Sequence, residues 1–479
     1  MTFSEIISFI DGEIAWGPVL LVLLFGVGLY FSFRTGFLQF RRFGFVMKNT
    51  IGKVFSSKQA EKGELTPWQS VTTALAATVG TGNIAGVTGA IAIGGPGAVF
   101  WMWVSALLGM VTKYAEVVLA VRYRERNARG ERVGGPMYYI RNGLGSKWKW
   151  MAVLFALLGG LASFGIGNAT QVNSIASSIT NAIDAFGGNT GGATITAFGS
   201  TFTVAALIVG ILVALLVALV ILGGLKAVGN VTEKLVPVMS VIYIISALVF
   251  IGFNITHVGS VFAMIFKGAF NPQAAIGGAA GITIMTAMQK GVSRGCFSNE
   301  AGLGSAPIAH ASTSEPDPVR QGVYGIFEVF VDTIVICTLT SLVVLCGQNA
   351  GIINISWGSG ADGTLVAASL GGVFGDKIAV LIIAVCLSLF ALSTIISWSL
   401  YGARCFEFFA GEKGAKVYRV IFVFVIIIGA VMSLDDVWNI ASILNGFMAL
   451  PNLVALLLLS PVVIKLTKEF FAKKKEQKD

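Results

Sequence analysis

Residues 76–86, read AATVGTGNIAG, bring hydroxyl, amide and glycine residues into an apolar stretch. Gly80, Gly82 and Gly86 fall within seven residues, and each glycine inside a helix costs about 1 kcal/mol relative to alanine. A break is therefore expected here. The end of one helical half would expose carbonyl oxygens, which suit a cation, and the start of the next would expose N–H groups, which suit a carboxylate. Together these groups predict a site for a zwitterion and a metal ion.

The spacing of these glycines is also compatible with two other interpretations. Gly82 and Gly86 match the G-x-x-x-G spacing that lets membrane helices pack closely. The spacing G-x-G-x-x-A from Gly80 to Ala85 also matches a dinucleotide fingerprint, but it lacks a strand–turn–helix context and lies in an apolar segment. Close helix packing stays open as an alternative, whereas nucleotide binding is disfavoured.

The composition of the chain places these residues in a membrane. Hydrophobic residues make up 55% of the 479 residues and charged residues only 12%, well below the roughly one quarter of soluble domains. A spanning helix needs roughly 20 apolar residues, and about eleven stretches qualify. They are residues 17–33, 67–93, 97–121, 150–183, 202–222, 228–254, 272–289, 319–346, 377–408, 417–434 and 437–464. Irregular backbone at membrane depth is tolerated only where protein buries it or where it lines a cavity, so the break indicates a ligand site.

A second glycine-rich stretch predicts an internal repeat. Gly277, Gly278 and Gly281 crowd residues 274–288, read AAIGGAAGITIMTAM. If the first span is set aside, the two interrupted spans open two successive sets of five. An odd number of spans makes the second set enter the membrane from the opposite face, which is typical of inverted repeats with a substrate site between two discontinuous helices.

These patterns predict an all-α polytopic membrane protein with a 5+5 inverted repeat. We expect a single integral membrane domain over residues 1–479. Its parts would be an extra N-terminal helix at 17–33, a first repeat at 67–254, a second repeat at 272–464 and a basic cytoplasmic tail at 465–479.

The distribution of positive charge predicts the orientation of the chain. The net charge is +9, and Lys and Arg concentrate in the loops at 34–62 and 122–132 and in the C-terminal tail. Loops rich in Lys and Arg stay in the cytoplasm. A cell-membrane location is therefore expected, with the N-terminus outside, the C-terminus inside, and contacts with anionic lipid rather than nucleic acid. The five cysteines and two histidines show no metal-binding spacing.

Four sequence blocks are long and specific. They are TALAATVGTGNIAGVTGAIAIGGPGAVFWMW from Thr73, KYAEVVLAVRYR from Lys113, GGPMYYI from Gly134 and GVSRGCFSNEAGLGSAPIAHA from Gly291. These blocks resemble the alanine or glycine:cation symporters, also called the sodium:alanine symporters, and the resemblance covers nearly the whole chain. It implies the fold of the bacterial leucine transporter, preceded by one additional helix. It also implies sodium- or proton-coupled uptake of small amino acids.

The resemblance implies roles for residues of the first break. The segment VGTGN is similar to the V-G-x-G-N pattern of the leucine transporter, so the Thr81 and Gly82 amides would meet the substrate carboxylate. The Thr78 carbonyl and the Asn83 side chain would face the position of a second cation. Neutral oxygens can replace the hydration shell of sodium without adding a large net charge in the membrane.

The same resemblance implies a first sodium site with ligands from two helices. The carbonyls of Ala76 and Val79 would face the ion. Ser393 and Thr394, in the segment FALSTIISWS at 390–399, would supply adjacent hydroxyls. In the alternative interpretation, these hydroxyls only bond to carbonyls of their own helix.

Amide side chains of a third span could line the substrate pocket. Phe164, Asn168 and Gln171 have spacings of four and three, which place them on one helical face. Amides can bond a carboxylate or an ammonium group without adding charge. Interhelical hydrogen bonding is an equally open interpretation.

The second glycine-rich stretch could close the pocket to larger side chains. Gly278, Gly281, Ile282 and Met285 would form a small apolar wall that favours alanine or glycine, and Thr283 is a candidate for the second cation. The predicted substrate-binding residues are Thr78, Gly80, Thr81, Gly82, Asn83, Phe164, Asn168, Gln171, Gly278, Gly281, Ile282, Thr283 and Met285.

Ionisable residues inside spans each raise a functional hypothesis. Lys113 and Glu116 stand one turn apart, and Glu328 and Asp332 share a helical face. An ion pair between Lys113 and Asp332, on neighbouring helices, would lower the free-energy cost of burying the two charges. In the alternative hypothesis, these ionisable residues couple transport to a proton. Lys290, Arg294 and Glu300 form either a cytoplasmic gate network or a solvated loop.

The sequence therefore predicts a secondary active symporter that works by alternating access. Its partners would be a small amino acid, sodium or a proton, and membrane lipid, with sodium as a co-transported ion and no other cofactor. A passive channel is an alternative. A membrane-embedded enzyme is disfavoured, because the spans lack a His, Cys and carboxylate constellation.

Overall fold

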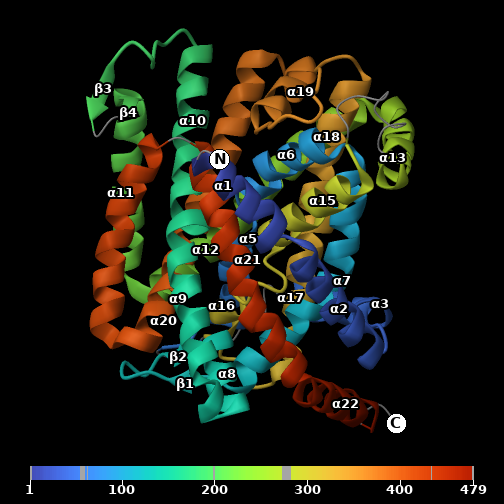
Figure 1. Cartoon of the computed structure of the whole chain (residues 1–479), viewed down its shortest axis with the longest axis vertical. Coiled ribbons are helices and arrows are strands. Elements are labelled where there is room, and N and C mark those ends of the chain that lie inside the picture. The colour runs from blue at the N-terminus through green and yellow to red at the C-terminus, as the bar shows by residue number, and fades with distance from the viewer. Residues whose placement is uncertain are drawn as a thin grey trace.

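The computed structural model describes residues 3–53, 60–61, 63–197, 200–271, 282–432 and 434–476, and helices dominate them (Figure 1). Eight of the described helices are long and apolar enough to cross a membrane, or nine if the bent pair at 67–94 is one span. The prediction of an all-α polytopic membrane protein is confirmed. The number of spans is not fixed at eleven, because α20 (Asp376–Val431) counts as one helix although Gly411, with φ 66° and ψ −165°, interrupts it.

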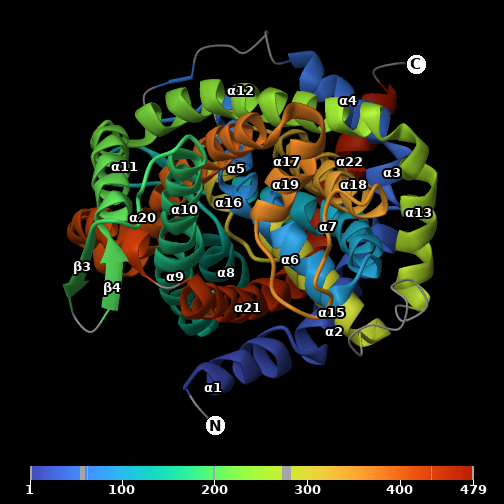
Figure 2. The same cartoon turned by 90° about the horizontal axis from the view of Figure 1, so that it is seen from above.

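The N-terminal segment lies outside the main bundle, beside α21 and α15 (Figure 2). It consists of α1 (Phe3–Phe9), a π-helical turn η1 (Ile10–Ala15) and α2 (Pro18–Arg34). Helix α2 packs closely on α7 (Gly97–Arg122), since a Cβ on Gly28 would lie only 2.7 Å from Leu108 Cβ. Two short helices follow, α3 (Leu38–Arg41) and α4 (Phe43–Asn49).

The next span is broken where the glycines predict a break. Helix α5 (Pro67–Thr78) begins at a proline and has a capping box, in which Thr66 and Gln69 bond each other's backbone amides at 3.0 and 3.1 Å. A short 3₁₀ turn η3 (Thr81–Asn83) separates it from α6 (Ala85–Gly94). The two halves are bent by 56°.

The rest of the first half runs outward from the centre of the bundle. Its helices are α8 (Pro136–Leu144), α9 (Lys149–Phe164), the π-turn η5 (Gly165–Ala169), α10 (Thr170–Ala185), α11 (Val204–Leu222), α12 (Gly224–Phe253) and α13 (Ile255–Phe270). Two small antiparallel hairpins, β1 (Glu125–Arg126) with β2 (Arg132–Val133) and β3 (Thr194–Ala197) with β4 (Ser200–Thr203), occupy loops.

The second half contains its own interrupted helix. Its elements are α15 (Ile284–Asn299), α16 (Pro307–Ala311), α17 (Pro318–Val329), the π-turn η6 (Phe330–Cys337), α18 (Thr338–Asn349), α19 (Thr364–Phe374), α20, α21 (Leu434–Leu458) and α22 (Ser460–Glu476). The span predicted at residues 272–289 does not coincide with the helix that the structure shows in this region. Residues 272–281 lie outside the described residues, and the helix of this region runs from Ile284 to Asn299.

The interrupted helices lie at the centre of the molecule. Figure 2 shows α5, α6 and α17 inside a ring made by α11, α12, α13 and α21. The ring presents an apolar exterior: on α11, Leu215, Leu219 and Leu222 are 58%, 70% and 85% exposed. Such a surface fits hydrocarbon rather than water.

The three basic regions of the chain gather at one end of the molecule. Figure 1 shows α3, the β1–β2 hairpin and α22 at this end. The N-terminus, the β3–β4 hairpin and α19 lie toward the opposite end. The structure therefore separates a basic end from the end that carries the N-terminus.

Candidate functional site

Neutral side chains hold the backbone amides of the first break. Directly after α5, Val79 and Gly80 leave the helical conformation. The Gly80 amide donates to Asn83 Oδ1 at 2.8 Å, and the Thr81 amide donates to Gln171 Oε1 at 3.3 Å. The Thr81 hydroxyl is buried and has no hydrogen-bond partner among the described residues. This unpartnered hydroxyl is consistent with a polar ligand at the break.

Three of the residues predicted for the first sodium site, from two helices, lie together. The Thr394 and Ser393 hydroxyls lie 3.0 and 3.3 Å from the Ala76 carbonyl oxygen, and each also lies within 3.0 Å of the Phe390 carbonyl. A hydroxyl has one proton, so each can donate to only one of these two carbonyls. A Cβ on Gly80 would lie 2.6 Å from Thr394 Oγ1, so only glycine fits beside this oxygen cluster. Neutral oxygens packed this closely can hold a small hard cation.

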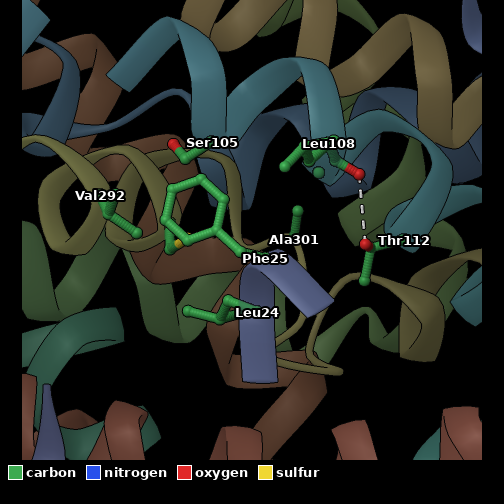
Figure 3. Close-up of a pocket in the computed structure, with 9 residues that line it drawn as sticks. Leu24, Phe25, Ser105, Leu108, Thr112, Val292 and Ala301 are labelled. Atoms are coloured by element: carbon green, nitrogen blue, oxygen red, sulfur yellow. Dashed lines mark hydrogen bonds between the residues drawn. The ribbon is translucent and has the colours of Figure 1, made fainter. Parts of the chain in front are cut away.

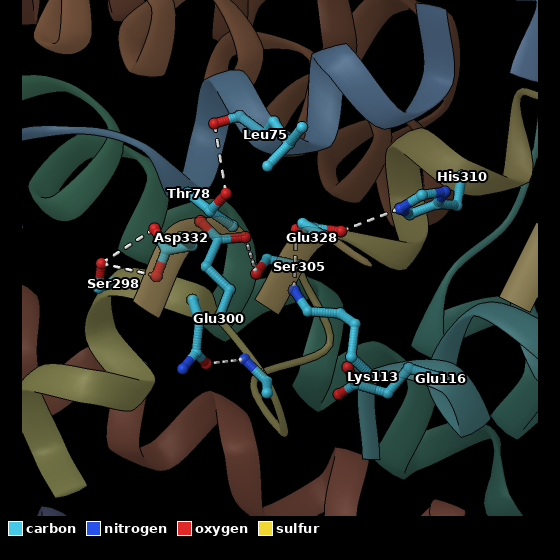
Figure 4. A network of polar contacts seen from close by, with 12 residues as sticks. Leu75, Thr78, Lys113, Glu116, Ser298, Glu300, Ser305, His310, Glu328 and Asp332 are labelled. Carbon is cyan, nitrogen blue, oxygen red and sulfur yellow. Dashed lines mark hydrogen bonds and ion pairs between the residues drawn. The ribbon is translucent and has the colours of Figure 1, made fainter. Parts of the chain in front are cut away.

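A buried carboxylate lies at the predicted second cation position. The Asn83 amide nitrogen donates to Asp332 Oδ1 at 2.7 Å, and the Thr333 hydroxyl donates to the same carboxylate at 2.7 Å. The Ser298 hydroxyl donates to it at 2.9 Å (Figure 4). The Thr78 hydroxyl donates to a carbonyl of its own helix at 3.3 Å, so the predicted ligand of this residue is its carbonyl. Asp332 thus joins the first break to the end of α15, a contact that the sequence analysis did not predict.

A second break lies at residues 300–306, between α15 and α16. Glu300, Gly302 and Gly304 have positive φ angles of 56°, 88° and 81°, which end the helix. The Glu300 carboxylate accepts hydrogen bonds from Ser305 Oγ at 2.6 Å and from Trp398 Nε1 at 2.8 Å. The sequence analysis expected this break at 274–288 instead. The signal that could have found it is the polar and glycine-rich run SNEAGLGSAP, which ends in a proline.

Another buried acid holds the backbone of the second break. Glu116 Oε1 accepts a hydrogen bond from the Gly304 amide at 3.1 Å and one from Asn452 Nδ2 at 2.5 Å. The other oxygen, Oε2, is buried and has no hydrogen-bond partner among the described residues. A carboxylate therefore bonds directly to a backbone amide of the second break, whereas neutral side chains accept from the Gly80 and Thr81 amides of the first break.

Lys113 pairs with Glu328 rather than with Asp332, which corrects the predicted pair. Its Nζ lies 3.2 Å from Glu328 Oε1, and both side chains are fully buried. Glu328 Oε2 lies 3.0 Å from His310 Nε2, on α16 (Figure 4). Glu328 and Asp332 share a helical face, so the sequence alone could not separate the two partners.

Buried carboxyl groups outnumber buried basic groups around the two breaks, among the residues that the structure describes. The fully buried groups there are four carboxyls, at Glu116, Glu300, Glu328 and Asp332, one ammonium, at Lys113, and the His310 imidazole. An unpaired charge in the membrane interior is costly. A cation bound in this region would offset the charge of an ionised carboxylate.

Of the three residues predicted on one face of the third span, the structure brings Gln171 to the first break. Asn168 Nδ2 donates to the Phe422 carbonyl at 2.8 Å, and Phe164 lies against Tyr418 with ring centroids 5.1 Å apart. Asn168 and Phe164 thus contact the second half of α20. The π-turn η5 lies between Phe164 and Gln171, and its extra residue rotates the side chains that follow.

The residues predicted from the second glycine-rich stretch do not meet the first break where the structure describes them. Gly278 and Gly281 lie outside the described residues. Thr283 is exposed and caps the start of α15, about 20 Å from Ser298 at the helical rise of 1.5 Å per residue. Met285 is 52% exposed, and Ile282 is buried near Gly95. Gly82 instead faces Phe297, with 3.5 Å between a Cβ built on Gly82 and Phe297 Cδ1.

The predicted gate network of Lys290, Arg294 and Glu300 does not form. Glu300 bonds Trp398 and Ser305, while Arg294 lies over the ring of Trp438, 5.2 Å from its centroid. The neighbouring Gln289 donates to the Trp16 carbonyl at 3.2 Å. Lys290 and Arg294 therefore lie beside the N-terminal segment, and not at the basic end where the sequence analysis expected them.

An apolar recess between α2, α7 and α15 lacks the chemistry of a substrate site (Figure 3). It is lined by residues such as Leu24, Phe25 and Val292. Its hydroxyls are already satisfied, because Ser105 and Thr112 donate to carbonyls of their own helix at 2.9 and 3.2 Å. The breaks, and not this recess, form the candidate functional site.

Comparison with known proteins shows the family of the chain. A family model described as the sodium:alanine symporter family matches residues 1–479. The chain is 43% identical over 472 residues to the sodium/alanine symporter AgcS of Methanococcus maripaludis, covering 98% of both chains. It is 36% identical over 474 residues to the probable sodium/glutamine symporter GlnT of Bacillus subtilis, covering 98% of this chain and 91% of that protein.

The fold is also similar to a solved transporter structure. The crystal structure of MhsT in complex with L-phenylalanine superposes with a TM-score of 0.57 at 16% sequence identity, covering 85% of this chain and 99% of that one. The predicted leucine-transporter-type fold is thereby confirmed. The protein is a transporter rather than an enzyme, and it belongs to the sodium:alanine symporter family.

Proposed function

We propose that this protein couples the entry of sodium to the uptake of a small neutral amino acid, alanine or glycine, by alternating access. The observation that carries the proposal is the cluster of the Ala76 carbonyl with the Ser393 and Thr394 hydroxyls, directly beside the Thr81 and Gly82 amides. The cluster suits a sodium ion, and the amides suit a carboxylate. Family membership supports sodium-coupled transport of amino acids.

The substrate carboxylate would replace a side-chain acceptor at the first break. The Thr81 amide now donates to Gln171 Oε1 over a long 3.3 Å, which a carboxylate oxygen can take over. Sodium at Ala76 and Thr394 would then lie close to the bound substrate. Because both ligands use the same stretch of backbone, each would raise the affinity of the other by the same factor.

Tight packing around the break favours a small side chain. A Cβ on Gly80 would meet Thr394 and Gln171 at 2.6 and 3.3 Å, and Phe297 covers Gly82. The relatives AgcS and GlnT are named for alanine and for glutamine, so the size limit needs direct measurement. The basic end of the molecule would face the cytoplasm, which places the N-terminus outside.

Uptake into proteoliposomes tests this function. Purified protein is reconstituted, and labelled alanine is added under an inward sodium gradient, with potassium or a pH gradient as the alternative driving force. We expect saturable accumulation that requires sodium, competition by glycine, and weak competition by leucine or glutamine. Flux that needs no co-ion and does not saturate would indicate a channel and contradict the proposal.

A further inference from the structure

Arg294 is a largely buried cation that lacks a hydrogen-bonded partner on one side. Its guanidinium lies over the rings of Phe297 and Trp438, 5.7 and 5.2 Å from their centroids. The Nη1 atom is buried and has no hydrogen-bond acceptor among the described residues. A buried guanidinium nitrogen without an acceptor is costly, so the arrangement points to an anionic ligand that is bound for part of the transport cycle.

The N-terminal segment covers this cation. The turn η1 is wedged between α15 and α21: Trp16 Nε1 donates to the Ser442 carbonyl at 3.0 Å, and a Cβ on Gly446 would lie 2.7 Å from the Ala15 carbonyl oxygen. Gln289 on α15 donates to the carbonyls of Gly12 and Trp16. The turn η1 therefore packs against both α15, which carries Arg294, and α21.

Asp11 is the acidic residue of η1 that faces the cation. One of its carboxylate oxygens is buried and has no hydrogen-bond partner among the described residues. Its charge acts on both Arg294 and Lys290, although no ion pair closer than 4 Å joins it to either of these cations in this state.

The aromatic pair separates Arg294 from the first break. Phe297 and Trp438 stack with ring centroids 5.3 Å apart, and a Cβ on Gly82 would lie 3.5 Å from Phe297 Cδ1. Arg294 is one helical turn before Phe297. The order from the N-terminal end is thus a cation, an aromatic pair and then the amides proposed to bind the substrate carboxylate.

We propose that Arg294 is a second carboxylate-binding position for the transported amino acid, reached before the first break. The inference rests on the proposed function. An incoming amino acid places its carboxylate on the guanidinium, and Lys290 adds to the attraction. It then passes the pair of Phe297 and Trp438 to reach the break.

Transport kinetics at two ionic strengths test the proposal. Arg294→Gln and wild type are reconstituted, and alanine uptake is measured at constant sodium with N-methylglucamine salts varying the ionic strength. Electrostatic attraction raises association rates by about tenfold or more and is screened by salt, so we expect a KM about tenfold higher for Arg294→Gln at low ionic strength. The KM of wild type should rise with ionic strength, and that of Arg294→Gln should not.

Equilibrium binding separates this role from a role in the central site. The dissociation constant of labelled alanine, measured on purified protein in sodium, should change less than twofold in Arg294→Gln. Lys377→Gln removes an equal charge on α20 and should behave as wild type. Asp11→Asn removes the competing acid and should lower the KM about twofold.

Distinct outcomes overturn the inference and the proposed function. Equal salt dependence in wild type and Arg294→Gln, or equal losses in KM and in equilibrium affinity, would overturn the second position. Arg294→Lys keeps the charge, so a monodisperse, thermally stable Arg294→Lys variant that has lost the salt dependence would also overturn it. Absence of sodium-driven uptake in wild type would overturn the proposed function, whatever the variants do.

Discussion

The two breaks of the central helices are stabilised in opposite ways. At the first break, amide and hydroxyl groups of Asn83, Gln171 and Thr394 contact the free backbone groups and the ends of the helices. At the second, the carboxylates of Glu116 and Glu300 hold the chain. Neutral partners can be displaced by an ion or a substrate at little electrostatic cost, whereas buried carboxylates fix both shape and charge. The backbone amides of the first break are therefore free to exchange their partners for a ligand, and the buried carboxyl groups fix the shape of the second break.

Filling the first break should have the largest effect. Gly80→Ala would bring a Cβ to 2.6 Å from Thr394 Oγ1 and displace the oxygen cluster. We expect sodium-driven alanine uptake to fall by about 100-fold, the cost of a displacement of roughly 1 Å in a positioned site. Gly86→Ala is the matched control, because its Cβ would meet nothing within 4 Å. Transport by Gly80→Ala at wild-type rates would show that the first break is not the binding site.

Removing an acid beside the second break should affect stability. Glu328→Gln leaves Lys113 buried without its charge partner, which costs about 3–5 kcal/mol. We expect a lower thermal midpoint for the purified variant in detergent. The double variant Lys113→Met with Glu328→Gln should recover most of this loss, because no lone charge is left. Equal thermal midpoints for wild type and Glu328→Gln would contradict the conclusion that this buried ion pair stabilises the second half of the chain.

Removing one neutral ligand should affect sodium more than substrate. Thr394→Ala deletes one hydroxyl beside the Ala76 carbonyl, and one such contact contributes about 1 kcal/mol. The sodium concentration for half-maximal uptake should rise by roughly five- to tenfold, with the order of competing amino acids unchanged. Thr180→Ala, which removes a hydroxyl bonded within α10, is the control. Unchanged sodium activation in Thr394→Ala would remove this residue from the sodium site.

Removing an acid outside the membrane should have the smallest effect. This variant is a reference for the variants at the two breaks. Burial raises the pKa of the Glu131 carboxyl, but the Arg404 and Arg129 guanidinium groups, 2.8 and 3.1 Å away, lower it more, and the net pKa lies below its ordinary value. This contribution to stability is full above the pKa of the unfolded chain and is lost as the pH falls through the folded value. The thermal midpoints of wild type and Glu131→Gln should therefore converge in acid. A constant difference between them at every pH would contradict this assignment.

The sequence indicated the first break because its glycines interrupt a continuous apolar run. The run SNEAGLGSAP carries a local signal for the second break at 300–306, where Glu300 in a left-handed conformation ends α15. The sequence could not indicate that Glu116, on a distant helix, holds this stretch. The partner of Lys113 depends on how α17 is rotated against α7. Glu328 and Asp332 lie on the same helical face, so the sequence does not determine which of them faces Lys113. Phe164 and Asn168 were misplaced for a local reason, since the π-turn η5 shifts the helical register before Gln171.

Equilibrium binding of both ligands to the purified protein tests the central claim most directly. Labelled alanine is titrated at low and high sodium, and labelled sodium is titrated with and without alanine. If both ligands share the backbone of residues 76–83, sodium should tighten alanine binding, and alanine should tighten sodium binding by the same factor of about 5 to 150. Alanine binding with equal affinity in sodium and in N-methylglucamine would contradict the account.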